Sequence, residues 1–142
     1  MPLRNKIQAL IIDDDPLTNA FNKELLSGND DFDNIVAISN GPEALNFVKN
    51  QLKTTGSVPD LILVDVYMPK MNGFEFIEEL DQFLLAHKKE ESVEVNILSS
   101  TSIEEDIVKF VQTNLAAKFI LKPLNREKLE HLVQRVEARQ YI

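Results

Sequence analysis

Four carboxylates of this sequence stand where they could bind a metal ion together. Asp13, Asp14 and Asp15 follow one short apolar run, and Asp65 follows another. Carboxylates that lie close together repel one another, and this repulsion raises their pKa values unless a cation is present. A site made only of oxygen ligands favours a hard ion such as Mg²⁺, or Mn²⁺ in its place. We therefore expect a metal site if the fold brings these acids together.

A hydroxyl group and an ammonium group occur at matching places further along the chain. Ser99, with Ser100 as the alternative, follows the fourth apolar run, and Lys122 follows the fifth. A hydroxyl can hydrogen-bond one phosphate oxygen, and a lysine ammonium can pair with another as a point charge. Phosphoryl transfer needs positioning and charge neutralisation more than acid–base help. With a carboxylate nucleophile and a metal ion, these groups predict phosphoryl transfer onto the carboxylate.

These side chains can meet only if the apolar runs form neighbouring strands. The runs are short and mostly continuous, which is typical of parallel strands covered on both faces, and helical patterns separate them. We expect strands at 7–12, 35–38, 61–64, 93–98 and 119–121. We expect helices at 16–27, 42–53, 74–87, 103–114 and 126–139, and loops at 27–34 and 54–59. The first of these helices carries Leu17, Phe21 and Leu25 at the spacing of an apolar face.

Five alternating strands and helices predict an α/β fold with a doubly wound parallel sheet. In such sheets ligands bind outside the carboxyl ends of the strands, where the residues after each strand meet. Each residue alone has a simpler explanation, since Asp15 could cap the helix that starts at Pro16, and Lys122 could be an ordinary surface lysine. The occurrence of all of them at strand ends is what indicates a shared site.

Composition narrows the classes of function. The chain has 142 residues, of which 44% are hydrophobic, and this suits a single domain with one core. Its net charge of −8 argues against nucleic-acid binding. It has no cysteine, and His87 and His131 are far apart, so we expect neither disulfides nor a thiolate or histidine-rich metal site. No apolar run approaches the roughly 20 residues of a membrane span, and we expect a cytoplasmic protein.

Four segments together resemble the receiver domain of two-component response regulators. They are LIIDDDP at 10–16, LILVDVYMPKMNG at 61–73, ILSSTS at 97–102 and FILKPL at 119–124. The resemblance covers about residues 5–139 and implies a flavodoxin-like (βα)₅ fold with strand order 2-1-3-4-5. The sequence is similar to single-domain receivers of the chemotaxis and sporulation type, so we expect one receiver domain over 1–142 and no effector domain.

The resemblance implies a role for each acid. Asp65 is the expected phosphoacceptor, and Asp13 and Asp14 are the expected acidic pair that holds Mg²⁺. The backbone carbonyl of Tyr67 would supply a further metal ligand. Gly73, which follows in the same segment, is expected to adopt a backbone conformation that other residues resist.

The same resemblance implies a conformational switch. Ser99 takes the position of the switch hydroxyl, with Ser100 as the alternative, and Lys122 is expected to contact the phosphoryl group. Phe119 matches an aromatic switch position, and the bond between Lys122 and Pro123 is often cis in relatives. Phosphorylation would move the hydroxyl and the ring, and so shift a pre-existing equilibrium.

The resemblance also implies partners. We expect a phosphoacceptor signalling protein rather than an enzyme, one that assists its own phosphorylation and dephosphorylation. A sensor histidine kinase or a histidine phosphotransfer protein would donate the phosphoryl group. The output would be binding to a protein target through a surface that includes Lys109, Lys118, Phe119 and Arg126. The protein would be a monomer or a phosphorylation-dependent dimer.

Two alternatives remain open. A haloacid-dehalogenase-type phosphatase would use Asp13 as nucleophile and Asp15 as a second acid, but it leaves the segment at 65–73 unexplained. A degenerate receiver would act only as a binding module, although the complete set of acids, hydroxyl and lysine argues against it.

Overall fold

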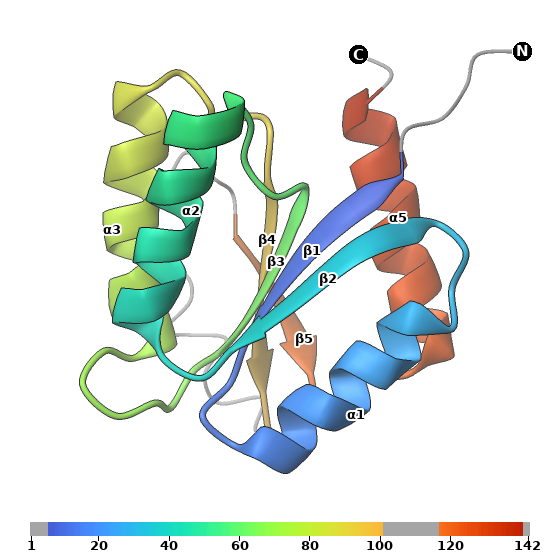
Figure 1. Cartoon of the computed structure of the whole chain (residues 1–142). Helices are drawn as coiled ribbons and strands as arrows, with labels where there is room; N and C mark the ends of the chain where they lie inside the picture. Colours follow the sequence, from blue (N-terminus) through green and yellow to red (C-terminus); the bar gives the residue numbers. More distant parts are fainter. Residues whose placement is uncertain (1–5, 101–116, 141–142) are drawn as a thin grey trace, which may run out of the picture.

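A computed structural model gives the structure of the chain and describes residues 6–100 and 117–140. Strands and helices alternate from β1 to β4, and β5 and α5 follow after the residues that are not described (Figure 1). The strands are β1 (Ile7–Ile12), β2 (Phe32–Ile38), β3 (Leu61–Asp65), β4 (Glu94–Ser99) and β5 (Lys118–Leu121). The helices are α1 (Pro16–Ser27), α2 (Gly41–Thr55), α3 (Gly73–Ala86) and α5 (Arg126–Gln140). The helix predicted at 103–114, with Lys109, lies outside the described residues.

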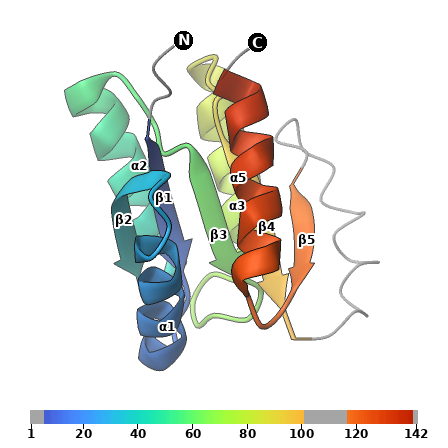
Figure 2. The same ribbon diagram turned by 90° about the vertical axis from the view of Figure 1, so that its right-hand side faces the viewer.

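The five described strands are parallel and form one sheet in the order β2-β1-β3-β4-β5, which confirms the predicted flavodoxin-like topology. Helices α2 and α3 cover one face of the sheet, and α1 and α5 cover the other (Figure 2). A separate apolar core lies on each face. The carboxyl ends of the strands share one edge, so the residues that follow them come together there. Within the described ranges, no helix is both long and apolar enough to span a membrane.

Strand β2 begins earlier than predicted. The prediction of a loop over 27–34 is wrong at its end, because β2 starts at Phe32. Phe32 is buried, pairs with Ile7 of β1 and packs in the core beneath α1 and α5. Asp33 and Asn34 follow with exposed side chains, and these polar residues hide the start of the strand from a search for apolar runs.

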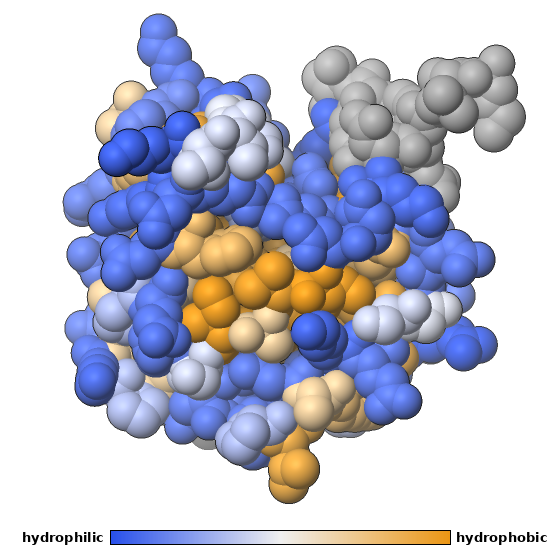
Figure 3. Space-filling model, viewed as in Figure 1, coloured by the Kyte–Doolittle hydropathy of each residue, from blue (hydrophilic) through white to orange (hydrophobic). Residues whose placement is uncertain are grey.

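Strand β2 is an edge strand, so its apolar residues are only partly covered. Val36 and Ile38 pack on the core beneath α2, and Ile35 packs on the opposite core. On the face shown in Figure 3, apolar side chains form a band across the middle of the molecule, where β2 crosses the same view in Figure 1. The edge of the sheet therefore leaves apolar surface open to solvent.

Helix α1 buries only part of the apolar face that its spacing predicts, since Leu25 packs on the core while Leu17 and Phe21 do not. Leu17 is 79% exposed and Phe21 is 50% exposed, so the prediction that they belong to the packed face is wrong. The buried residues are Asn19, Asn22 and Leu26. The orientation is set at the start of the helix, where Asn19 is hydrogen-bonded to the ends of β1 and β2.

A buried ionic cluster joins α5 to β4 near the amino end of that strand. Glu94 is 2% exposed, and its carboxylate accepts from Nε of Arg135 at 3.0 Å and from Nε of Arg139 at 3.2 Å. Asn96 is also buried, donates to Oε2 of Glu94 at 3.1 Å and accepts from Nη2 of Arg135 at 2.9 Å. A buried carboxylate is tolerated when it is paired and hydrogen-bonded. The two arginines therefore hold α5 in place against β4.

Asp60 joins the beginnings of three strands. Its N–H donates to the carbonyl of Gln8 at 3.0 Å, its Oδ2 accepts from the N–H of Gln8 at 2.9 Å, and its carbonyl accepts from the N–H of Glu94 at 2.9 Å. Burial raises the pKa of Asp60. The hydrogen bond from Gln8 lowers this pKa and the negative charge of Asp33 raises it, but burial is the largest effect. The ionised carboxylate is therefore less favourable in the folded chain than in the unfolded chain.

We predict that Asp60→Asn stabilises the chain at neutral pH. Asparagine keeps an acceptor for the N–H of Gln8 and removes a charge that folding disfavours. The gain in the free energy of unfolding should be complete above the raised pKa of Asp60, fade as the pH falls through it, and vanish below the ordinary pKa of aspartate. Urea unfolding at several pH values measures this, with Asp33→Asn as a control that gives a smaller gain. A gain that stays constant into strong acid would contradict the prediction.

Helix α3 ends in a backbone conformation that suits glycine. Lys88 has a φ of 57°, and the N–H of Lys89 donates to the carbonyl of Leu84 at 2.8 Å, as in a Schellman motif. We predict that Lys88→Gly raises the free energy of unfolding by about 1 kcal/mol, because this conformation costs other residues about that much. Lys89→Gly is the matched control and should not stabilise. Equal effects of the two substitutions in urea unfolding would refute this explanation.

Candidate functional site

Three carboxylates meet at the carboxyl ends of β1 and β3. Asp13, Asp14 and Asp65 each offer a carboxylate oxygen, and these oxygens lie within 4.8 Å of one another. Asp13 is 2% exposed, Asp65 is half-buried and Asp14 is exposed, so the cluster opens to solvent on one side. Strands β1 and β3 are neighbours, which brings residues far apart in the sequence to one place.

Lys122 is the positive charge that enters this cluster. Its Nζ lies 2.7 Å from Oδ1 of Asp65 and 3.1 Å from Oδ2 of Asp13. Burial alone would lower the pKa of Lys122, but the hydrogen bond and charge of Asp65, together with Asp13, outweigh it and raise that pKa. The lysine is therefore held as an ammonium ion.

The acids still carry more charge than one lysine compensates. Burial raises the pKa of Asp65, and the negative charges of Asp13 and Asp14 raise it further. The hydrogen bond and charge of Lys122 lower this pKa but do not cancel the rise. Three carboxylates against one ammonium leave an excess of negative charge at the edge of the sheet. This arrangement favours a second cation.

The segment after β5 fixes the position of Lys122. The N–H of Lys122 donates to the carbonyl of Ser99 at 2.6 Å, and the peptide bond between Lys122 and Pro123 is cis, as the sequence suggested. Nζ of Lys128 donates to the carbonyls of Leu121 at 2.5 Å and Pro123 at 3.0 Å. Lys128 thus holds the backbone on both sides of Lys122. Sequence reasoning missed this residue, because its partners are backbone atoms.

The start of α1 fixes the position of Asp13. The N–H of Asp15 donates to Oδ1 of Asp13 at 2.9 Å, and Nδ2 of Asn19 donates to the carbonyl of Asp13 at 2.8 Å. Asp15 itself caps α1, because its carboxylate accepts from the N–H of Leu17 at 3.2 Å and from Oγ1 of Thr18 at 2.7 Å. The hydrogen bond from Thr18 lowers the pKa of Asp15, followed by that from Leu17. Asp15 therefore serves the helix rather than the cluster.

Helix α3 begins directly beneath Asp65. Asn72 and Glu75 form a capping box, and the N–H of Gly73 donates to the carbonyl of Val66 at 2.8 Å. A Cβ at Gly73 would lie 2.5 Å from the backbone oxygen of Asp65. The expectation that Gly73 has a conformation other residues resist is wrong, since its φ is not positive. Glycine is needed for the close approach of two backbone segments.

The predicted switch residues lie at the same edge of the sheet or close to it. Ser99 ends β4 and is 1% exposed, whereas Ser100 is exposed. Phe119 is half-buried in β5, opposite Ile97 of β4. Tyr67 is 67% exposed, two residues beyond Asp65. The roles of these residues, including the Tyr67 carbonyl as a metal ligand, stay predictions.

A family model and two curated relatives match most of this chain. A sequence model of the response regulator receiver domain matches residues 9–134. The probable C4-dicarboxylate response regulator DctR of Bacillus subtilis (strain 168) is 28% identical over 132 residues, which are 93% of this chain and 53% of that protein. The transcriptional regulatory protein MalR of the same organism is 32% identical over 124 residues, 87% of this chain and 47% of that protein. The chain thus spans about half the length of these curated relatives.

A solved structure of similar shape covers nearly the whole chain. The crystal structure of a two-component response regulator from Cytophaga hutchinsonii matches with a TM-score of 0.80 at 29% identity. The match covers 92% of this chain and 97% of that chain.

We predict that Gly73→Ala lowers the free energy of unfolding by about 1–3 kcal/mol, because the added methyl group overlaps the Asp65 backbone. Gly28→Ala is the control, since a Cβ there meets its nearest atom at 3.6 Å. Urea unfolding of the two variants makes the comparison. A Gly73→Ala variant as stable as Gly28→Ala would show that the close approach is not required.

Proposed function

The chain belongs to the response regulator receiver family of two-component signal transduction, and we propose that Asp65 is its phosphoacceptor, with Asp13 and Asp14 as metal ligands. The observation that carries the proposal is the meeting of three carboxylates and one lysine at the carboxyl ends of β1, β3 and β5. The phosphatase alternative needs Asp15 as a second catalytic acid, and the use of Asp15 as a helix cap argues against it.

The donor set fits a hard divalent cation. It consists of carboxylate oxygens close together with an excess of negative charge, and no cysteine is present in the chain. Asp13, Asp14 and Asp65 would hold Mg²⁺ or Mn²⁺, with the Tyr67 carbonyl as the further ligand that the resemblance implies. When bound, the ion supplies charge neutralisation for the oxygens of the phosphoryl group.

Asp65 would act as the nucleophile in its ionised form. Its oxygen forms a bond to phosphorus while the bond from phosphorus to the donor imidazole breaks, and the electron pair of that bond stays with the imidazole. The ammonium of Lys122, which pairs with Asp65 and Asp13 in the free protein, would pair with a phosphoryl oxygen in the phosphorylated one. Lys122 would thus exchange one anionic partner for another.

The exchange at Lys122 gives phosphorylation a route to the rest of the fold. The backbone N–H of Lys122 is hydrogen-bonded to the carbonyl of Ser99. We therefore propose that the Ser99 hydroxyl, with Ser100 as the alternative, turns toward the phosphoryl group. Phe119, three residues before Lys122, would turn inward at the same time. Lys118, Phe119 and Arg126 would then belong to the surface that binds a protein target.

The phosphoryl donor must reach Asp65 from outside. The half-buried Asp65 and the exposed Asp14 mark the open side of the cluster, and Leu17 and Phe21 expose apolar surface on nearby α1. We propose a sensor histidine kinase or a histidine phosphotransfer protein as the donor. Its surface would cover these side chains while its phosphohistidine meets Asp65.

The experiment that tests the proposal is incubation with acetyl phosphate and Mg²⁺, followed by intact mass. We predict the added mass of one phosphoryl group, its absence when a chelator removes Mg²⁺, and its absence in Asp65→Asn. Asp33→Asn, which removes an exposed aspartate of β2, is the matched control and should react like the unmodified chain. Equal labelling of Asp65→Asn would contradict the assignment, and so would an unmodified chain with both acetyl phosphate and phosphoramidate.

A further inference from the structure

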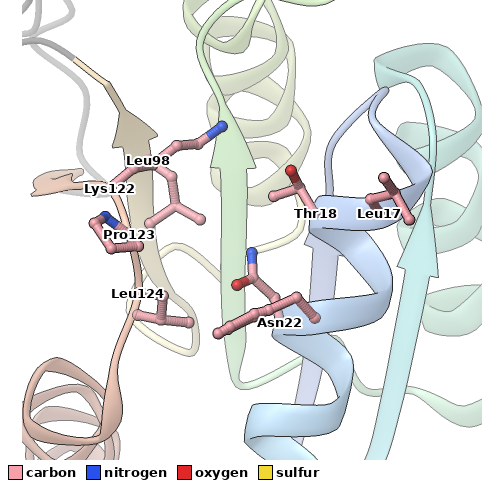
Figure 4. A pocket seen from close by; sticks show the side chains of 8 residues that line it. Leu17, Thr18, Asn22, Leu98, Lys122, Pro123 and Leu124 are labelled. Atoms are coloured by element: carbon pink, nitrogen blue, oxygen red, sulfur yellow. The ribbon is translucent and has the colours of Figure 1, made fainter.

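A cavity of about 280 Å³ lies beside the carboxylate cluster, between α1 and the segment after β5 (Figure 4). Its walls are mostly apolar and include Phe21, Leu98 and Leu124. The aliphatic stem of Lys122 contributes to the wall, while its ammonium points toward the end of β3, where it pairs with Asp65. The cavity is therefore next to the cluster but does not share its charged groups.

One polar side chain faces the cavity without a partner. Asn22 is 5% exposed, and its carboxamide points into the space in front of Leu98 and Leu124 (Figure 4). This carboxamide makes no hydrogen bond with a side chain or backbone group in the ranges 6–100 and 117–140. The nitrogen and oxygen of this amide still reach solvent within the cavity, so a molecule that fills the cavity must replace water as their hydrogen-bond partner. A ligand that carries both a donor and an acceptor can meet both atoms of the amide at once.

The orientation of α1 creates this cavity. The helix directs Asn22 inward and leaves Leu17 and Phe21 at the outer rim, although burial of the apolar side would be favoured by packing alone. A leucine at position 22 would contribute apolar surface to the core that includes Leu98 and Leu124. The amide instead leaves an apolar chamber with one polar group at its inner side.

We propose that this cavity binds a small uncharged molecule that carries a carboxamide on an apolar body. A carboxamide has both an N–H donor and a carbonyl acceptor, so it satisfies both halves of the Asn22 side chain at once. The volume is just below the usual range of ligand pockets, which limits the molecule to roughly ten non-hydrogen atoms. An uncharged ligand fits because the Lys122 ammonium is already held by Asp65 and Asp13. The site is separate from the phosphoacceptor assignment and does not depend on it.

Benzamide is the probe for this site. We expect benzamide to shift the backbone amide signals of Thr18, Asn22, Lys122 and Leu124 in ¹⁵N-labelled full-length chain, saturably and with a Kd of about 1–10 mM, as suits a fragment of this size. Acetophenone has the same shape with a methyl group in place of the amino group. It should bind about threefold to tenfold more weakly, because it lacks one hydrogen-bond donor.

Asn22→Leu tests whether Asn22 is responsible for the preference. Leucine has nearly the same shape and suits a buried position, so the variant should fold, which its amide spectrum confirms. It should lose the preference for benzamide over acetophenone. Asn46→Leu, on the exposed side of α2, is the matched control and should keep the preference. The proposal is overturned if wild type shows no saturable shifts, if the shifts map away from the cavity, or if Asn22→Leu keeps the full preference.

Discussion

Repulsion among three carboxylates is the interaction on which the rest of the site depends. The parallel order of β1 and β3 brings Asp13, Asp14 and Asp65 within a few ångströms of one another, and burial strengthens the repulsion. Lys122 offsets part of the negative charge in the free protein. The remaining charge favours a divalent cation, and the proposed phosphoryl transfer depends on that cation.

Several elements hold these like charges together by fixing the backbone rather than the charged groups. Asn19 binds the carbonyl of Asp13, Lys128 binds the carbonyls on both sides of Lys122, and α3 packs against the backbone of Asp65 at Gly73. At the other end of the sheet, the cluster around Glu94 fastens α5 to β4. The acids thus lie on a framework that is held by apolar burial, by side-chain hydrogen bonds to the backbone and by the ion pairs of Glu94.

The sequence predicts that these side chains meet, because topology alone brings strand ends together, whereas their roles stay predictions. Asp13, Asp65 and Lys122 each follow a buried run, and this is enough to place them at one edge of a doubly wound sheet. The buried face of α1 could not be predicted, since spacing alone favours Leu17 and Phe21, whereas a long-range hydrogen bond from Asn19 decides the orientation.

Other features depend on partners that no local pattern reveals. The need for Gly73 comes from the nearby backbone of Asp65, and the role of Lys128 comes from two carbonyls in another segment. The early start of β2 is hidden because Asp33 and Asn34 interrupt its apolar residues. In each case the deciding contact is tertiary, so it becomes visible only when the elements are assembled.

The most direct measurement is a crystal structure of the chain with Mg²⁺ and beryllofluoride, an analogue of the phosphoryl group. We expect the beryllium bound to a carboxylate oxygen of Asp65, the metal ion in contact with Asp13 or Asp14, and the Lys122 ammonium moved onto a fluorine of the analogue. Beryllofluoride on any other side chain, or a metal ion held away from both N-terminal acids, would contradict the assignment of Asp65.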